Sequence, residues 1–146
     1  MCLDLFKDVS DPSYSFIIAE IGNNHQGSLD HAFKLIDQAK ECGADAVKFQ
    51  KRCNKKLFTP DFYNSPYDNP NSFGDSYGIH RDAIELTIEN MAKLKRYADK
   101  IGITFFCTPF DEQSLYELES LDLDFYKVAS ADLVHIPFLK LISKTK

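Results

Sequence analysis

The sequence predicts an α/β protein built around a parallel β-sheet. Short apolar runs rich in β-branched or aromatic residues alternate with segments of helical periodicity, and this order recurs four times along 146 residues. A repeated strand–helix order is typical of parallel strands joined by crossover helices. Two architectures fit this order: an open doubly wound sheet, and part of a (β/α)8 barrel, which needs about 250 residues when complete.

The first strand–helix unit has clear boundaries. The run "FIIAEIG" at 16–22 reads as a buried strand that ends at a glycine. A helix is expected over 28–43, with Ser28 as the N-cap and Gly43 as the stop. The run "DAVKFQ" at 45–50 predicts the second strand. Because no GxGxxG fingerprint follows the first strand, dinucleotide binding is disfavoured.

The remaining elements follow the same alternation after one long interruption. Residues 51–79 are rich in Pro, Asn and Gly, which predicts an irregular stretch, and a loop this long is usually functional. The elements expected after it are a long helix at 80–102, a strand at 104–110, a helix at 111–122, a strand at 125–130 and a helix from 136. The chain is expected to form one domain, 1–146, with no second domain.

Composition limits the classes of partner and the location. With 17 basic and 22 acidic residues the net charge is −5, which argues against nucleic acid or an anionic membrane as the main partner. A small anionic substrate remains compatible with this charge. Residues 1–15 lack the features of a secretory signal, and no apolar stretch approaches the roughly 20 residues of a membrane span. Because Cys2, Cys42, Cys53 and Cys107 show no metal-ligand spacing, we expect reduced thiols in a cytoplasmic protein.

Polar side chains occur at the carboxyl ends of the predicted strands. Lys48 and Gln50 share one face of the second strand, Thr108 lies near the end of the third, and Lys127 and Ser130 lie in the fourth. Ligands of parallel α/β folds bind at this end of the sheet. Two ammonium groups and two hydroxyls would suit a dianion such as a phosphate. Alternatively, each lysine on its own extends from a strand end to water.

Glu20 and the turn "GNNHQG" at 22–27 form a second polar group at the end of the first strand. Amides and an imidazole next to a carboxylate are suited to reading the hydroxyls of a ligand. Alternatively, Glu20 caps the following helix or pairs with a neighbouring lysine. His25, taken alone, is expected to be structural rather than a ligand.

Four motifs together resemble the sialic acid synthase family, which includes N-acetylneuraminate synthase and its relatives. They are "FIIAEIGNNHQGSLDHAFKLIDQAKECGADAVKFQ", "YGIHRDAIEL", "KLKRYADKIGITFFCTPFD" and "FYKVASADL", and the resemblance runs from about residue 16 to the end. It implies a TIM-type (β/α)8 barrel, of which this chain carries about the first four βα units. It also implies a transferase that condenses phosphoenolpyruvate with an N-acylated amino sugar, such as N-acetylmannosamine, to a sialic acid, and releases phosphate.

The resemblance implies a role for particular residues. The expected phosphoenolpyruvate contacts are Lys48, Thr108, Lys127 and Ser130. The expected sugar contacts are Glu20, Gln50 and Asn71. Glu20, Lys48 and Lys127 are the expected catalytic residues, the two lysines neutralising the phosphate and carboxylate charges.

The chain also departs from the family pattern. The family uses a divalent metal, Mn or Mg, bound by histidines of later strands, so no metal ligand is expected here. We further expect the chain to be inactive alone, and to form a homodimer or pair with a partner chain that completes the barrel, because open sheet edges promote association. The alternative function is a non-catalytic half-barrel that binds a phosphorylated ligand or a partner subunit.

Overall fold

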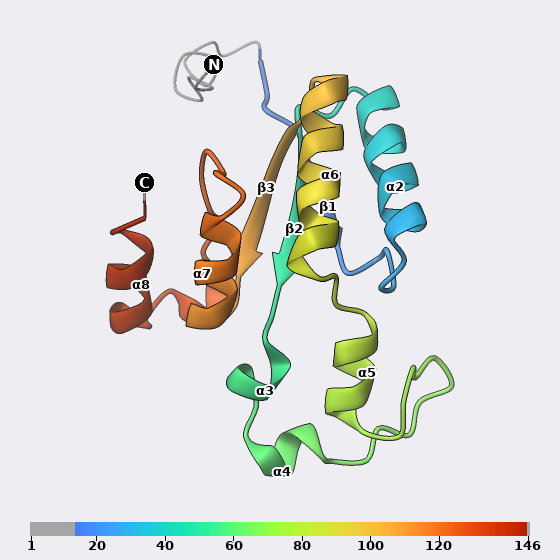
Figure 1. Ribbon diagram of the computed structural model, residues 1–146, viewed down its shortest axis with the longest axis vertical. Helices are drawn as coiled ribbons and strands as arrows, with labels where there is room; N and C mark the ends of the chain where they lie inside the picture. Colours follow the sequence, from blue (N-terminus) through green and yellow to red (C-terminus); the bar gives the residue numbers. More distant parts are fainter. Residues whose placement is uncertain (1–13, 146) are drawn as a thin grey trace.

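The computed structural model describes residues 14–145, and its centre is a three-stranded parallel sheet in the order β1-β2-β3 (Figure 1). The strands are β1 (Ile18–Gly22), β2 (Ala46–Lys51) and β3 (Thr104–Pro109). β2 lies in the middle and pairs in parallel with both neighbours. The first three predicted strands therefore form as expected. The predicted parallel α/β class is confirmed.

Helices cover one face of this sheet. α2 (Leu29–Glu41) and α6 (Ile88–Ile101) lie side by side along it, and α7 (Glu112–Glu119) follows β3 (Figure 1). The side chains of Ser28 and Asp111 accept hydrogen bonds from the first-turn N–H groups of α2 and α7, as N-caps do. Apolar residues of the sheet and helices form one core: Ile36, Val47, Phe49, Met91, Leu94, Phe105 and Cys107.

The prediction of one continuous helix at 80–102 is wrong. The structure has two helices, α5 (Tyr77–Ala83) and α6, separated by residues 84–87. Thr87 has extended backbone (φ −69°, ψ 160°), and its side chain accepts a hydrogen bond from the N–H of Asn90, so it starts a new helix. Ile84 and Leu86 are buried in the break, so the apolar periodicity continues although the helix does not.

Residues 51–79 contain short helices within the expected irregular stretch. These are α3 (Asn54–Leu57) and α4 (Pro60–Tyr63). Pro60 occupies the first turn of α4, where its missing N–H costs no hydrogen bond. Rings from this stretch and α5 pack together, with centroids 4.7–5.5 Å apart among Phe58, Phe62, Tyr67 and Tyr77.

The fourth predicted strand, 125–130, is reduced to a single bridge. Tyr126 pairs in parallel with Cys107 of β3, and the N–H of Lys127 donates to the carbonyl of Cys107 at 3.1 Å. A 3-10 helix, η1 (Ser130–Asp132), and α8 (Ile136–Ile142) follow directly. The segment thus has the predicted position and direction. It is not a full strand because, among the described residues, it pairs on one side only and turns into η1 within a few residues.

The opposite face of the sheet is the polar one. Glu20, Lys48 and Thr108 project from it, whereas Val47 and Phe49 point into the helix-covered core. Within residues 14–145 no helix is both long and apolar enough to cross a bilayer. The absence of a secretory signal was predicted from residues 1–15, of which only 14 and 15 belong to the described residues.

Candidate active site at the carboxyl ends of the strands

Four predicted site residues meet because neighbouring strands are in register. Glu20 of β1 stands opposite Lys48 of β2, and Gln50 of β2 stands opposite Thr108 of β3. Each of these side chains lies on the polar face, since Lys48 and Gln50 are two residues apart. Strand alternation therefore brings a carboxylate, an ammonium and a hydroxyl together, and Glu20 pairs with a neighbouring lysine, as its structural alternative predicted.

The Lys48 ammonium is buried and has three partners. Its Nζ lies 2.9 Å from Glu20 Oε2, and it donates to Thr108 Oγ1 at 2.9 Å and to the carbonyl of Phe49 at 3.3 Å. Only 3% of Lys48 is exposed, whereas the Glu20 side chain is 52% exposed. The three acceptors match the three N–H donors of a lysine ammonium, so none of its donors is left without a partner. An incoming anion can replace Glu20 on Lys48, because Glu20 is the partner that reaches solvent.

The backbone at Gly22 leaves room between Glu20 and Gln50. Gly22 has a positive φ of 55°, and a side chain there would come within 3.4 Å of Glu20 Oε1 and 3.6 Å of Gln50 Nε2. Both polar atoms therefore border the same small volume, and glycine keeps it free.

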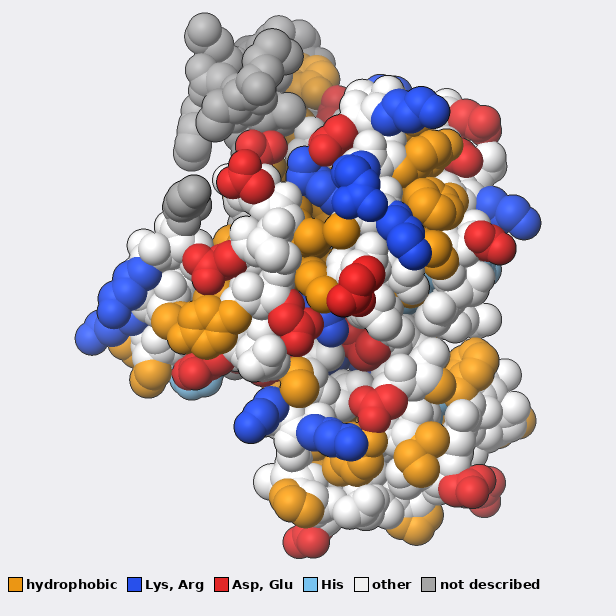
Figure 2. Space-filling view, in the orientation of Figure 1, with side chains coloured by type: hydrophobic (Ala, Val, Ile, Leu, Met, Phe, Trp, Pro, Cys, Tyr) orange, Lys and Arg blue, Asp and Glu red, His pale blue; other side chains and the backbone are white. Residues whose placement is uncertain are grey.

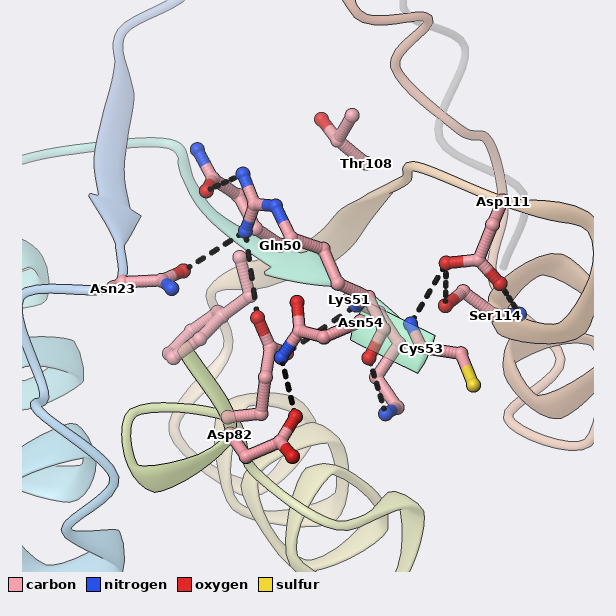
Figure 3. A network of polar contacts seen from close by, with 12 residues as sticks. Asn23, Gln50, Lys51, Cys53, Asn54, Asp82, Thr108, Asp111 and Ser114 are labelled. Atoms are coloured by element: carbon pink, nitrogen blue, oxygen red, sulfur yellow. Dashed lines mark hydrogen bonds and ion pairs between the residues drawn. The ribbon is translucent and has the colours of Figure 1, made fainter. Parts of the chain in front are cut away.

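Next to this cluster lies a polar network that includes Asn23 and Gln50 (Figure 3). Its centre is Arg52, which the sequence did not single out. Its guanidinium donates to Gln50 Oε1 at 2.7 Å and to Asn23 Oδ1 at 3.3 Å. It also lies 3.5 Å from Glu85 Oε1 and 3.7 Å from the centroid of the Phe110 ring. The available signal was alternation: positions 48, 50 and 52 continue one face of β2 past its end.

Burial sets the electrostatics of the Arg52–Glu85 pair. Burial raises the pKa of Glu85 above its usual value, and the nearby Arg52 charge opposes that rise. Burial likewise lowers the pKa of Arg52, while Glu85 acts in the opposite direction. Each group stabilises the charged form of the other, so loss of either one leaves a buried charge without its partner.

A second set of contacts anchors the segment after β2. Asp111 accepts from the N–H of Cys53 at 2.7 Å and from the hydroxyl of Ser114 at 2.7 Å (Figure 3). Asn54 donates to Asp82 at 2.8 Å. These bonds tie the β2–α3 connection to α7 and α5, which holds Arg52 between them.

His25 is structural in this arrangement, as expected. It is buried and stacks on Phe49 with centroids 5.9 Å apart, and its Nδ1 accepts a hydrogen bond from the N–H of Gly27. Burial lowers the pKa of His25 to about 4, so the ring is neutral at pH 7.

Three predicted site residues do not join the Lys48 cluster through any contact found among the described residues. Lys127 is exposed and donates to the neighbouring carbonyl of Val128 at 3.3 Å. Ser130 is exposed at the start of η1. Asn71 is exposed, and its backbone N–H donates to Asn69 Oδ1 at 2.8 Å. Their roles towards substrates stay predictions, as do those of Glu20, Gln50, Lys48 and Thr108.

The residues at this place do not fit a divalent metal. Glu20 is the carboxylate that contacts the Lys48 cluster, and it is already ion-paired. Throughout residues 14–145, no group of three or more His, Cys, Asp or Glu side chains is arranged for a metal ion. Mn or Mg therefore remains an expectation from the resemblance alone.

Comparison with known proteins defines the class. The NeuB family profile matches residues 35–146, and this chain belongs to that family. It is 42% identical over 129 residues to human N-acetylneuraminate-9-phosphate synthase, covering 88% of this chain and 36% of that protein. It is 36% identical to N,N'-diacetyllegionaminic acid synthase of Campylobacter jejuni, covering 89% of this chain and 39% of that protein. The chain thus spans little more than a third of these curated relatives.

Solved structures agree with the fold. The N-acetylneuraminic acid synthetase of Leptospira borgpetersenii, determined in complex with citrate, matches with a TM-score of 0.72 at 30% identity, over 89% of this chain and 41% of that one. A spore coat polysaccharide biosynthesis protein E of Chromobacterium violaceum matches with a TM-score of 0.71 at 28% identity, over 88% of this chain and 38% of that one. The predicted family and the predicted partial (β/α)8 barrel are both confirmed.

Proposed function

We propose that this chain forms the phosphoenolpyruvate-binding part, and one side of the sugar-binding part, of a sialic acid synthase-type transferase. The observation that carries the proposal is the buried Lys48 ammonium, held between Glu20 and Thr108 at the carboxyl ends of parallel strands. The relatives named as synthases of N-acetylneuraminate 9-phosphate and diacetyllegionaminic acid support the substrate class.

The proposed reaction joins C3 of phosphoenolpyruvate to the aldehyde carbon of an open-chain N-acyl amino sugar, such as N-acetylmannosamine. The aldehyde oxygen takes a proton and becomes a hydroxyl, water adds at C2, and the C2–O bond to phosphate then breaks. The products are the sialic acid and inorganic phosphate.

Lys48 has a direct task in this scheme. The phosphate or carboxylate of phosphoenolpyruvate replaces Glu20 on the Lys48 ammonium, with Thr108 as a neighbouring hydroxyl donor. Glu20 is then free to accept hydrogen bonds from sugar hydroxyls beside Gly22. Lys127 and Ser130 are proposed to move towards the same anion.

Phosphoenolpyruvate binding tests this assignment. Lys48→Ala should weaken binding, measured by calorimetry, by at least about tenfold, because a charge-assisted hydrogen bond is worth about 1.5–3 kcal/mol. Lys55→Ala provides the control, since Lys55 is exposed on α3 and has the same charge. Equal losses from the two variants would overturn the assignment, and circular dichroism would check that both remain folded.

Phosphate release, measured with and without the remaining part of a barrel, separates the synthase function from the non-catalytic half-barrel. We expect no phosphate release when the chain alone is mixed with phosphoenolpyruvate, N-acetylmannosamine and manganese, because most of each relative's length lies outside the matched part. The non-catalytic half-barrel also predicts binding without turnover. Addition of the remaining part of a relative's barrel would distinguish the two functions, because only the synthase part should then release phosphate. We also propose a cytoplasmic location, which suits the free thiols of Cys42, Cys53 and Cys107.

A further inference from the structure

Arg52 holds two side-chain amides by their oxygen atoms. One of its terminal nitrogens donates to Gln50 Oε1 at 2.7 Å, and the other donates to Asn23 Oδ1 at 3.3 Å. A guanidinium only donates hydrogen bonds, so each amide must turn its oxygen towards it. The two NH2 groups are therefore left for other partners.

Arg52 is itself fixed in place. Its side chain is only 10% exposed; Glu85 lies 3.5 Å from one terminal nitrogen, and the Phe110 ring lies under the guanidinium. The backbone N–H of Arg52 also donates to Glu85 Oε2 at 3.2 Å. A planar cation held by an ion pair, a ring and its own backbone is a rigid template for the amides.

The freed NH2 group of Gln50 lies beside the Lys48 cluster. Gln50 Nε2 and Glu20 Oε1 both border the volume next to Gly22, the first as a donor and the second as an acceptor. Asn23 Nδ2 is buried and has no hydrogen-bond partner in the part of the chain that the structure describes. The site thus presents fixed donors next to a carboxylate.

We propose that Arg52 is a positioning residue that fixes Gln50 as a hydrogen-bond donor, so that Gln50 binds an oxygen atom of the acceptor sugar while Glu20 accepts from a neighbouring hydroxyl. This inference rests on the proposed function for the identity of the sugar. It assigns to Gln50 a definite polarity: the ligand atom facing it must accept a hydrogen bond. Without Arg52 the Gln50 amide can rotate, and either end can face the ligand.

Two variants test the donor role of the Gln50 amide separately from the stability of the fold. Gln50→Glu keeps an acceptor for Arg52 but has no N–H to donate. The double variant Arg52→Met/Glu85→Gln removes the template without leaving a buried carboxylate unpaired. Glu85→Gln alone retains Arg52 and serves as the first control, and Arg96→Met, at an exposed position of α6, serves as the second.

Two measurements are made on each variant of the full chain. Nitrogen-15 relaxation of the Gln50 side-chain NH2 group, without ligand, reports whether the amide is held. Titration with N-acetylmannosamine in the presence of phosphoenolpyruvate, followed by nuclear magnetic resonance, reports affinity. We expect the double variant to lower the Gln50 order parameter and to weaken sugar binding by about tenfold, the effect of one hydrogen bond. Gln50→Glu should weaken binding at least as much, and Arg96→Met should change neither quantity.

The outcomes distinguish the two proposals. An unchanged Gln50 order parameter in the double variant, or full sugar affinity in Gln50→Glu, would overturn the positioning role. Failure of the wild-type chain to bind the sugar, with the order parameter still falling in the double variant, would remove the proposed substrate and support the role of Arg52. Glu85→Gln keeps Arg52 and a side-chain acceptor beside it, so it should lower the Gln50 order less than the double variant does. Equal losses of order in the two variants would assign the effect to Glu85 and overturn Arg52 as the template.

Discussion

At the scale of single residues, burial and partners decide what each polar side chain can do. Lys48 is buried with three acceptors, one of which is the half-exposed carboxylate of Glu20. Lys127 is exposed, and its ammonium donates to the carbonyl of the next residue, Val128. Strand position in the sequence suggested similar surroundings for Lys48 and Lys127. Their burial differs because only Lys48 has a strand on both sides.

His25 predicts a pH dependence of stability. Its pKa is about 4 in the folded chain and about 6.5 when unfolded, so between these values the unfolded chain binds a proton that the folded chain does not. Folding stability should therefore fall by about 3 kcal/mol as the pH falls from about 6.5 to 4. Urea unfolding of the wild type and His25→Gln at several pH values would measure this. The slope should flatten in His25→Gln and largely persist in His31→Gln, an exposed position of α2; identical profiles for all three would contradict it.

At the scale of elements, the turn between β1 and α2 packs tightly against the end of α5. A Cβ atom at Gly27 would lie 2.2 Å from the carbonyl oxygen of Ala83, whereas one at Gly43, after α2, would meet nothing within 4 Å. Both glycines have positive φ, 76° and 83°. The two positions thus share a backbone conformation and differ in their surroundings.

This pair gives a matched prediction. Gly43→Ala should lower the free energy of unfolding by about 1–2 kcal/mol, the usual cost of a left-handed conformation for a side chain. Gly27→Ala should cost clearly more, because the turn must also move away from α5. Urea denaturation of the two variants measures both losses, and equal losses would show that the turn and α5 do not pack as described.

At the scale of the whole molecule, apolar side chains are exposed beside the edge strand β1 and in the segment between η1 and α8. Ile17 and Ile18 are about half-exposed on the β1 side, and Leu133 and Val134 are 70% and 82% exposed between η1 and α8. In Figure 1 β3 and α7 lie between β1 and α8, and Figure 2 shows orange apolar side chains at several places on the face in view. Exposed edges and apolar groups of this kind promote association.

We therefore predict that the chain dimerises with a second copy. Sedimentation should give a dimer for the wild type and a monomer for Leu133→Glu/Val134→Glu, because the added charges oppose burial of the segment between η1 and α8. Ile79→Glu, a change of the same kind on α5, should leave the dimer intact. A monodisperse wild-type monomer would rule out the dimer.

The sequence by itself determined the order of strands and helices and the polar residues at the strand ends, because periodicity and strand alternation are local properties. Only the tertiary structure decided three other features: the break at 84–87, the single bridge at Tyr126, and the Arg52 network. Arg52 joins Asn23, Glu85 and Phe110, residues far apart in the chain, so no local pattern indicates their contact. The same reason applies to Lys48: its type and strand position were readable, but its partners Glu20 and Thr108 depend on the register of three strands.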